Sequence, residues 1–196
     1  MHARYFDLGD GLEAKPALRS DANALIELVR HNVEHIGRYL PPVAGIVTPE
    51  KAQAHFDLVE RQMEEGTLID WHLYQNGVLC GEIRFNHIEA ANCKTAVGCF
   101  IDSRLQGRGL IGHAMTHLLA YAFDELHFNR VEWRCDVSNT PSRRVAERLG
   151  FVLEGRLRQA EYSENGFQDV LVFSLLASEY AAQARKVATI SLSSNF

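Results

Sequence analysis

The chain has 196 residues, of which 46% are hydrophobic and 23% are charged, a composition typical of a soluble globular protein with a substantial core. Its formal net charge of −5 argues against a general nucleic-acid binder, which carries a basic surface. No apolar run is long enough to span a bilayer, and residues 1–7 lack the apolar stretch of a secretory signal. We therefore expect a cytoplasmic protein that does not bind membranes.

The N-terminal third predicts one or two short strands followed by helices, with an edge strand over residues 12–18. The strand contains Pro16, which an edge position tolerates. Ser20 or Asp21 can cap the first helix, and Thr48 can cap the second, which has proline at its first position. In chain order the predicted segments are a strand over Leu12–Leu18, a helix through Ile36 that Pro41-Pro42 ends, and a helix from Thr48 to Gly66.

From Leu68 onward the apolar period indicates strands. Asn76-Gly77 and Asn165-Gly166 are each flanked by alternating apolar residues, which is a strong signal for a hairpin. The predicted segments are strands over 68–74, 78–85 and 95–101, a helix over 110–126, a strand over 131–137, a helix over 138–150, and strands over 152–162 and 167–175.

This order of segments predicts an α/β (α+β) fold in one domain over residues 1–184, followed by a loosely held tail over 185–196. The sheet is expected to be mixed and mostly antiparallel, with one parallel crossover.

The cysteines and histidines predict no metal site. The cysteines stand singly, so we expect small buried hydrophobic side chains rather than disulfides or ligands. His113 and His117 are four residues apart on a predicted helix, but Ala114 stands where a zincin helix needs a glutamate, which favours a surface or packing pair. The four cysteines are Cys80, Cys93, Cys99 and Cys135.

A glycine-rich loop, Gln-Gly-Arg-Gly-Leu-Ile-Gly over 106–112, precedes the predicted long helix. Glycine lets backbone N–H groups approach a ligand, and a helix that starts there adds unsatisfied N–H groups and the positive end of its dipole. Together these features predict an anion site suited to a pyrophosphate. The segment has neither the Gly-Lys-Ser/Thr ending of a P-loop nor the Gly-x-Gly-x-x-Gly of a dinucleotide-binding fold.

A second motif follows the next predicted strand, from Asn139 to Phe151, where Asn-x-x-Ser leads into a short helix that ends in Gly-Phe. The two motifs together resemble the GNAT superfamily of N-acetyltransferases. Segments such as Cys80-Gly81-Glu82 and Asn129-Arg130-Val131 resemble its RimJ/RimL-type branch of ribosomal-protein acetyltransferases. The resemblance implies the GNAT fold with a splayed parallel pair of strands and flanking helices, acetyl-CoA as co-substrate, no metal, and a primary amine as acceptor.

The resemblance also implies a cofactor site. The glycine-rich loop would hold the pyrophosphate of coenzyme A, the end of the preceding strand would run along the pantetheine arm and polarise the thioester carbonyl, and Asn139 would reach the arm or the thiol. Ile111 departs from the small residue expected at its position. The implied cofactor residues are Phe100, Ile101, Gln106, Gly107, Arg108, Gly109, Leu110, Ile111, Gly112, Asn139 and Ser142.

Three residues are candidates for the acid–base chemistry. Ser142 is the candidate general acid, because Ala146 stands where many members of the superfamily have a tyrosine; its structural alternative is an early-helix residue that satisfies a backbone N–H. Glu161 matches an acidic residue of the Rim-like branch and is the preferred general base, unless it is only a solvated carboxylate. Glu82 is the second candidate, acting through a water, unless it is a cross-strand partner of an arginine. Trp71 and Trp133 are expected in the core.

The chemistry of the acceptor favours a protein N-terminus. An α-amine with a pKa of about 7.7–8 is neutral in roughly one molecule in ten at pH 7, and a lysine in about one in 2,500, a difference of about 3.5 kcal/mol. Two alternatives remain open, a small amine such as a polyamine, amino acid or antibiotic, and a coenzyme A-binding protein without catalysis. The resemblance also allows a homodimer.

Overall fold

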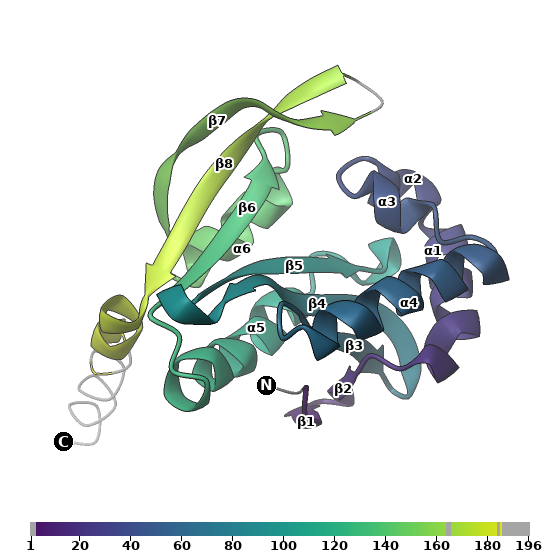
Figure 1. Ribbon diagram of the computed structural model, residues 1–196, viewed down its shortest axis with the longest axis horizontal. Helices are drawn as coiled ribbons and strands as arrows, with labels where there is room; N and C mark the ends of the chain where they lie inside the picture. The colour runs from purple at the N-terminus through teal and green to yellow at the C-terminus, as the bar shows by residue number, and fades with distance from the viewer. Residues whose placement is uncertain (1–2, 164–165, 184, 186–196) are drawn as a thin grey trace.

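The computed structural model describes residues 3–163, 166–183 and 185, and its centre is a twisted sheet (Figure 1). Eight strands lie in the order β1-β2-β3-β4-β5-β6-β8-β7. Only β5 and β6 are parallel neighbours, which confirms the mixed sheet with one parallel crossover. The strands are β1 (Phe6–Gly9), β2 (Leu12–Pro16), β3 (Ile69–Gln75), β4 (Val78–Glu89), β5 (Lys94–Ile101), β6 (Arg130–Asp136), β7 (Val152–Ser163) and β8 (Gly166–Leu176).

Helices cover both faces of this sheet. One buried apolar cluster joins α5 and α6 to one face, and a second joins α1 and α4 to the other. Trp71 and Trp133 are buried in the first cluster, as predicted. The helices are α1 (Ala22–His31), α2 (Val33–Gly37), α3 (Pro41–Ala44), α4 (Pro49–Glu64), α5 (Leu110–Ala120), which continues as a π-helical turn (Tyr121–Glu125), and α6 (Thr140–Arg148).

The N-terminal strand is not at the edge of the sheet, contrary to prediction. β2 pairs with β3 along its whole length, and its other side is covered by β1. Pro16 is the last residue of β2, where the lack of a backbone N–H removes no hydrogen bond from the middle of the strand. Its presence therefore did not require β2 to be an edge strand.

The predicted first helix is two helices, because the chain turns at Asn32. This residue has φ −125° and ψ 15°, outside the helical region, and its buried side chain donates to the carbonyl of Leu28 at 2.9 Å. Asp21 does not cap the helix; its carboxylate accepts from the backbone of Leu18 at 3.2 Å and pairs with His72 at 2.8 Å. The Pro41-Pro42 pair also differs from expectation, because it opens α3 rather than ending a helix.

Other local predictions are confirmed. Thr48 caps α4 by accepting a hydrogen bond from the amide of Lys51 at 3.4 Å. Asn76 and Gly77 both have positive φ and connect β3 to β4 in a tight hairpin. A helix over 177–183 was not predicted, and the strand β1 is the second of the one or two short N-terminal strands, whose bounds the sequence did not define. Asn165 and residues 186–196 of the predicted tail lie outside the described residues.

The parallel strands β5 and β6 are splayed, as the resemblance implied. They pair only from Lys94 with Arg130 to Val97 with Trp133, although β5 continues to residue 101 and β6 to residue 136. Figure 1 shows the two strands diverging. We call the unpaired parts, residues 98–101 of β5 and 134–136 of β6, the splay.

No helix in the described ranges combines the length and the apolar content needed to cross a membrane.

Candidate active site

The glycine-rich loop ends at the start of α5 with its backbone open to solvent. Gly107 and Gly109 have φ values of +74° and +78°, a conformation that favours glycine, and no described atom lies within 4 Å of where a Cβ would be. The amide of His113 is bonded to the carbonyl of Gly109 at 2.9 Å. The amides before it therefore belong to the first turn, whose N–H groups have no carbonyl partner in the same helix. This arrangement fits an anion.

The predicted loop residues share this exposed position. Residues 106–109 are exposed and residues 110–112 are half-buried. The side chain of Ile111 packs against the core and therefore does not obstruct the open side of the loop. The departure from a small residue there is thus accommodated by the core.

The segment before the loop is fixed to the α1–α2 corner. Asn32 accepts a hydrogen bond from the amide of Ser103 at 2.8 Å, and His35 lies 2.8 Å from the side-chain nitrogen of Gln106. Asp102 is buried and accepts from the amide of Arg104 at 2.9 Å. The guanidinium of the same arginine holds the pKa of the Asp102 carboxyl below its usual range.

Phe100 and Ile101 lie in the splay with their side chains buried on opposite faces of the sheet. Ile101 pairs with Gly81 of β4, where an added Cβ would lie 2.5 Å from the carbonyl oxygen of Phe100. Gly81 thus permits the close approach of β4. In the splay, the backbone N–H and C=O groups of β5 that point toward β6 form no hydrogen bonds with that strand. They are therefore available to bind an extended ligand.

Ser142 lies beside β6 at the point where the splay begins. Trp133, the last residue of β6 that pairs with β5, donates its indole N–H to the Ser142 hydroxyl oxygen at 2.9 Å. Burial raises the pKa of the Cys135 thiol, and the nearby hydroxyl of Ser142 acts on that pKa in the opposite direction. Asn139 accepts from the Ser142 amide at 3.1 Å and so caps α6. Among the described residues, the donor to the Ser142 hydroxyl is the indole of Trp133 and not a backbone N–H.

Glu161 is exposed on β7, near the far end of the β7–β8 hairpin. It pairs with Gln168, and the next pair is Tyr162 with Phe167. These two rings are 72% and 65% exposed and lie 5.2 Å apart. The described residues provide no hydrogen bond between Glu161 and Ser142, so the structure does not bring the preferred base and the acid into contact.

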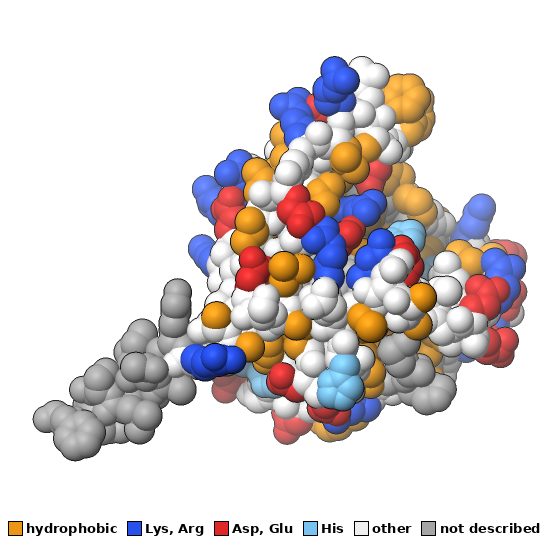
Figure 2. All heavy atoms as spheres, turned by 60° about the vertical axis from the view of Figure 1, so that its left-hand side comes forward, with side chains coloured by type: hydrophobic (Ala, Val, Ile, Leu, Met, Phe, Trp, Pro, Cys, Tyr) orange, Lys and Arg blue, Asp and Glu red, His pale blue; other side chains and the backbone are white. Residues whose placement is uncertain are grey.

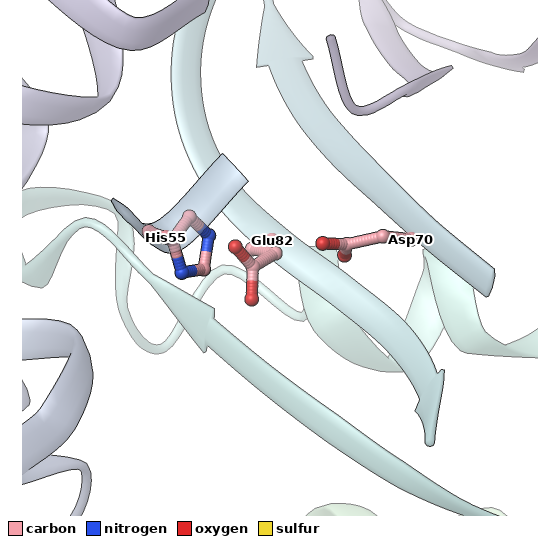
Figure 3. Close-up of side chains that lie close together, drawn as sticks. All are labelled: His55, Asp70 and Glu82. Carbon is pink, nitrogen blue, oxygen red and sulfur yellow. The ribbon is translucent and has the colours of Figure 1, made fainter. Parts of the chain in front are cut away.

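Glu82 lies in a buried polar cluster beneath α4 (Figure 3). Arg84, two residues further along the same strand, donates to Asp70 at 3.0 Å and pairs with Glu82. The expected arginine is therefore present, but its cross-strand partner is Asp70 rather than Glu82. Burial raises the pKa of Glu82 to about 7, against the effect of Arg84, and burial lowers the pKa of His55 to about 4.

The same cluster has the spacing of a metal site but already contains a cation. Ligand atoms of His55, Asp70 and Glu82 lie within 4.8 Å of one another. The guanidinium of Arg84 contacts both carboxylates and supplies the positive charge between them. Sequence reasoning missed this cluster. The alternation of charged and apolar residues on β3 and β4 places its members on one face of the sheet, which is the signal that was available.

The cysteine prediction holds for three of four positions. Cys80 and Cys135 are buried and Cys99 is half-buried, but Cys93 is exposed, because it ends a 3-10 turn with φ 47°. All four thiols are free. The predicted histidine pair is confirmed as a packing pair, with ring centroids 5.0 Å apart and His113 bonded to the carbonyl of Leu8 at 2.6 Å.

The face drawn in Figure 2 mixes basic and acidic side chains over the β6–β8–β7 part of the sheet. Arg130 pairs with Glu154 at 2.6 Å and Arg156 pairs with Asp169. This surface therefore presents no uniform field of one charge.

Comparison with known proteins agrees with this geometry. The family model "Acetyltransferase (GNAT) domain" matches residues 12–152. The chain is 32% identical over 167 residues, covering 83% of this chain and 90% of the relative, to "Putative ribosomal N-acetyltransferase YdaF" of Bacillus subtilis (strain 168). It is 34% identical over 102 residues, 52% of this chain and 57% of the relative, to "Ribosomal-protein-serine acetyltransferase" of Escherichia coli (strain K12).

A solved structure of RimL, a ribosomal L7/L12 alpha-N-protein acetyltransferase in complex with coenzyme A, is 26% identical to the chain, with a TM-score of 0.81. The match covers 90% of this chain and 99% of that one. The splay, the glycine-rich loop and these similarities together show that the chain belongs to the GNAT family of acetyltransferases.

Proposed function

We propose that this enzyme transfers the acetyl group of acetyl-CoA to the N-terminal α-amine of a protein, with ribosomal proteins as the first acceptors to test. The observation that carries the proposal is the splay, with an open helix start at the end of one strand and the Ser142 hydroxyl beside the other. The relatives named as ribosomal-protein acetyltransferases support the acceptor, and the coenzyme A complex of RimL supports the cofactor.

The cofactor would enter along β5. Its pyrophosphate would accept hydrogen bonds from the amides of 107–112, where the helix dipole also favours a negative charge. The pantetheine amides would pair with the unpaired backbone edge of 98–101, much as an added strand would. The amide nitrogen of Asn139 is a further donor for this arm, because its oxygen is engaged in capping α6. The thioester would then lie in the splay beside Ser142.

The acceptor would approach from the side of the β7–β8 hairpin. Tyr162 and Phe167 present exposed aromatic surface at the end of that hairpin, next to the carboxylate of Glu161. Exposed aromatic groups suit contact with a peptide, because they bury a large area with little loss of side-chain entropy. A carboxylate beside them can accept a proton from the ammonium form of the peptide terminus.

Two residues then share the acid–base chemistry, one at the attacking amine and one at the leaving sulfur. Glu161 takes the proton that the amine loses as nitrogen attacks the thioester carbon, and Ser142 gives a proton to the leaving sulfur. Thiols have a pKa of about 8.5, so a weak acid is sufficient for this leaving group. Glu82 is the alternative base, and its burial with Arg84 means that it would act only through intervening groups.

A panel of acceptors incubated with acetyl-CoA tests the proposal, with thiol release as the signal. The panel holds peptides with ribosomal-protein N-termini, the same peptides with blocked termini, and small amines. We expect turnover with the open termini and loss of it on blocking. Turnover of small amines alone would show that the acceptor is a small molecule rather than a protein N-terminus. Coenzyme A binding without turnover of any amine would contradict the enzymatic function.

A further inference from the structure

The two buried tryptophans use their indole N–H groups in different ways. Trp71 donates to the backbone carbonyl of Arg4 and Trp133 donates to the side-chain hydroxyl of Ser142, each at 2.9 Å. A buried indole N–H needs an acceptor, and a backbone carbonyl serves that need without further consequence. Trp133 instead occupies one acceptor position of a hydroxyl group that lies beside the splay.

This contact limits the hydrogen bonds that the Ser142 hydroxyl can make. A serine hydroxyl has one O–H donor and two acceptor positions. The indole takes one of the acceptor positions, and Asn139 holds the backbone amide of the same residue at 3.1 Å. The O–H donor of Ser142 is used in no hydrogen bond to the described residues, and Ser142 lies beside β6 where the splay begins. The O–H donor is therefore available to the sulfur of a bound thioester.

We propose that Trp133 is a positioning residue for the protonation of the leaving thiolate, acting through Ser142, an inference that rests on the function proposed above. In this step the amine nitrogen bonds to the thioester carbon and the carbon–sulfur bond breaks. The sulfur takes the hydroxyl proton of Ser142, and the proton that Glu161 takes from the amine returns to the Ser142 oxygen through solvent. As the hydroxyl proton leaves, the indole N–H stabilises the negative charge that develops on the oxygen.

The direct test compares Trp133→Phe with Trp71→Phe. Each substitution keeps a buried aromatic ring and removes one indole hydrogen bond of the same length, so both variants should lose similar stability in urea unfolding. With saturating acetyl-CoA and a peptide acceptor, kcat should fall about three- to tenfold in Trp133→Phe, the effect of one neutral hydrogen bond. Trp71→Phe should retain the wild-type kcat, and the affinity for coenzyme A should be unchanged in both.

A double substitution separates positioning from general packing. If Trp133 acts only through Ser142, adding Trp133→Phe to Ser142→Ala should reduce kcat no further. Equal kcat in Trp133→Phe and wild type, or full multiplication of the two losses in the double variant, would overturn the proposal. Absence of turnover in the wild-type enzyme would instead refute the proposed function, so the two failures are distinguishable.

A spectroscopic measurement serves if Trp133→Phe does not fold. The chain has two tryptophans and therefore gives two indole N–H signals in ¹⁵N-labelled protein. Ser142→Ala should shift one signal and accelerate its exchange with solvent while leaving the other in place. Two unmoved signals would overturn the proposal.

Discussion

The side-chain oxygen of Asn32 accepts a hydrogen bond of 2.8 Å from the backbone amide of Ser103 and so joins the corner between α1 and α2 to the segment after β5. Its nitrogen donates to the carbonyl of Leu28 at 2.9 Å, and the side chain is 2% exposed. Both ends of one buried amide are thus satisfied by backbone groups from two separate parts of the chain.

We predict that Asn32→Ala destabilises the protein by about 1–3 kcal/mol, because it leaves two backbone groups without their partner. The loss also frees the segment that precedes the glycine-rich loop, so the affinity for coenzyme A should fall. Urea unfolding and calorimetric titration measure the two effects. Asn92→Ala, which removes an exposed side-chain contact to Glu89, is the control and should change neither quantity.

Gly109→Val tests the assignment of the pyrophosphate site. A side chain at φ +78° strains the backbone and projects into the open space before α5, so coenzyme A affinity should fall well beyond the loss of stability. Gly66→Val is the matched control, because Gly66 has φ +72°, equally open surroundings and a position at the end of α4. Unchanged coenzyme A affinity in a folded Gly109→Val protein would end the assignment.

Glu161→Gln should lower the rate at pH 7 by about 10²–10⁴-fold, the usual contribution of a general base. Without this carboxylate the reaction depends on amine that is already neutral, so the rate should recover as the pH rises past about 8. Ser142→Ala should not recover in this way, because its defect concerns the leaving group. Rates from about pH 6 to 10 with a peptide acceptor check both profiles. A Glu161→Gln enzyme as active as wild type at pH 7 would move the assignment to Glu82.

Glu82→Gln should change the pH dependence of stability. The folded-state pKa of Glu82 is about 7, above the usual 4.5, so the folded protein retains a proton that the unfolded chain has lost between these values. The contribution of Glu82 to the stability of the wild-type protein therefore decreases as the pH rises through this window. The variant lacks this loss, and its stability relative to wild type should increase from pH 4.5 to 7 and then stay level.

Glu154→Gln provides the control of opposite sign for that measurement. Arg130 lowers the pKa of Glu154 to about 2, so wild-type stability is gained above the usual 4.5 and lost as the pH falls toward 2. Glu154→Gln should be less stable than wild type at neutral pH, with a difference that disappears in acid. A difference between Glu82→Gln and wild type that does not change with pH would contradict the account.

Local signals in the sequence predicted most of the sheet and the cofactor motifs. Asn76-Gly77 determined a hairpin because both residues tolerate positive φ, and Thr48 determined a helix start because its hydroxyl replaces a missing carbonyl. The loop around Gly107 and Gly109 was recognisable because positive φ angles require glycine at these two positions, which is also a local property of the sequence.

The errors arise where distant residues decide the local structure. Asn32 interrupts a helix that its neighbours favour, because its side chain is bonded to a segment 71 residues away. β2 is covered by β1, a strand of four residues whose bounds its own residues do not define. The polar face of β3 and β4 is buried because α4 packs on it, which alternation alone does not reveal. The partner of Ser142 is equally invisible in sequence, since Trp133 has the pattern of an ordinary core residue.

The measurement that tests the central claim most directly is a competition within one peptide that carries both a free N-terminus and an internal lysine. The enzyme, acetyl-CoA and this peptide are incubated at pH 7, and fragmentation mass spectrometry locates the acetyl group. The account predicts acetylation at the α-amine in large excess, because its neutral form is favoured by about 3.5 kcal/mol over that of lysine. Acetylation at the lysine alone, or no acetylation of any peptide amine, would contradict it.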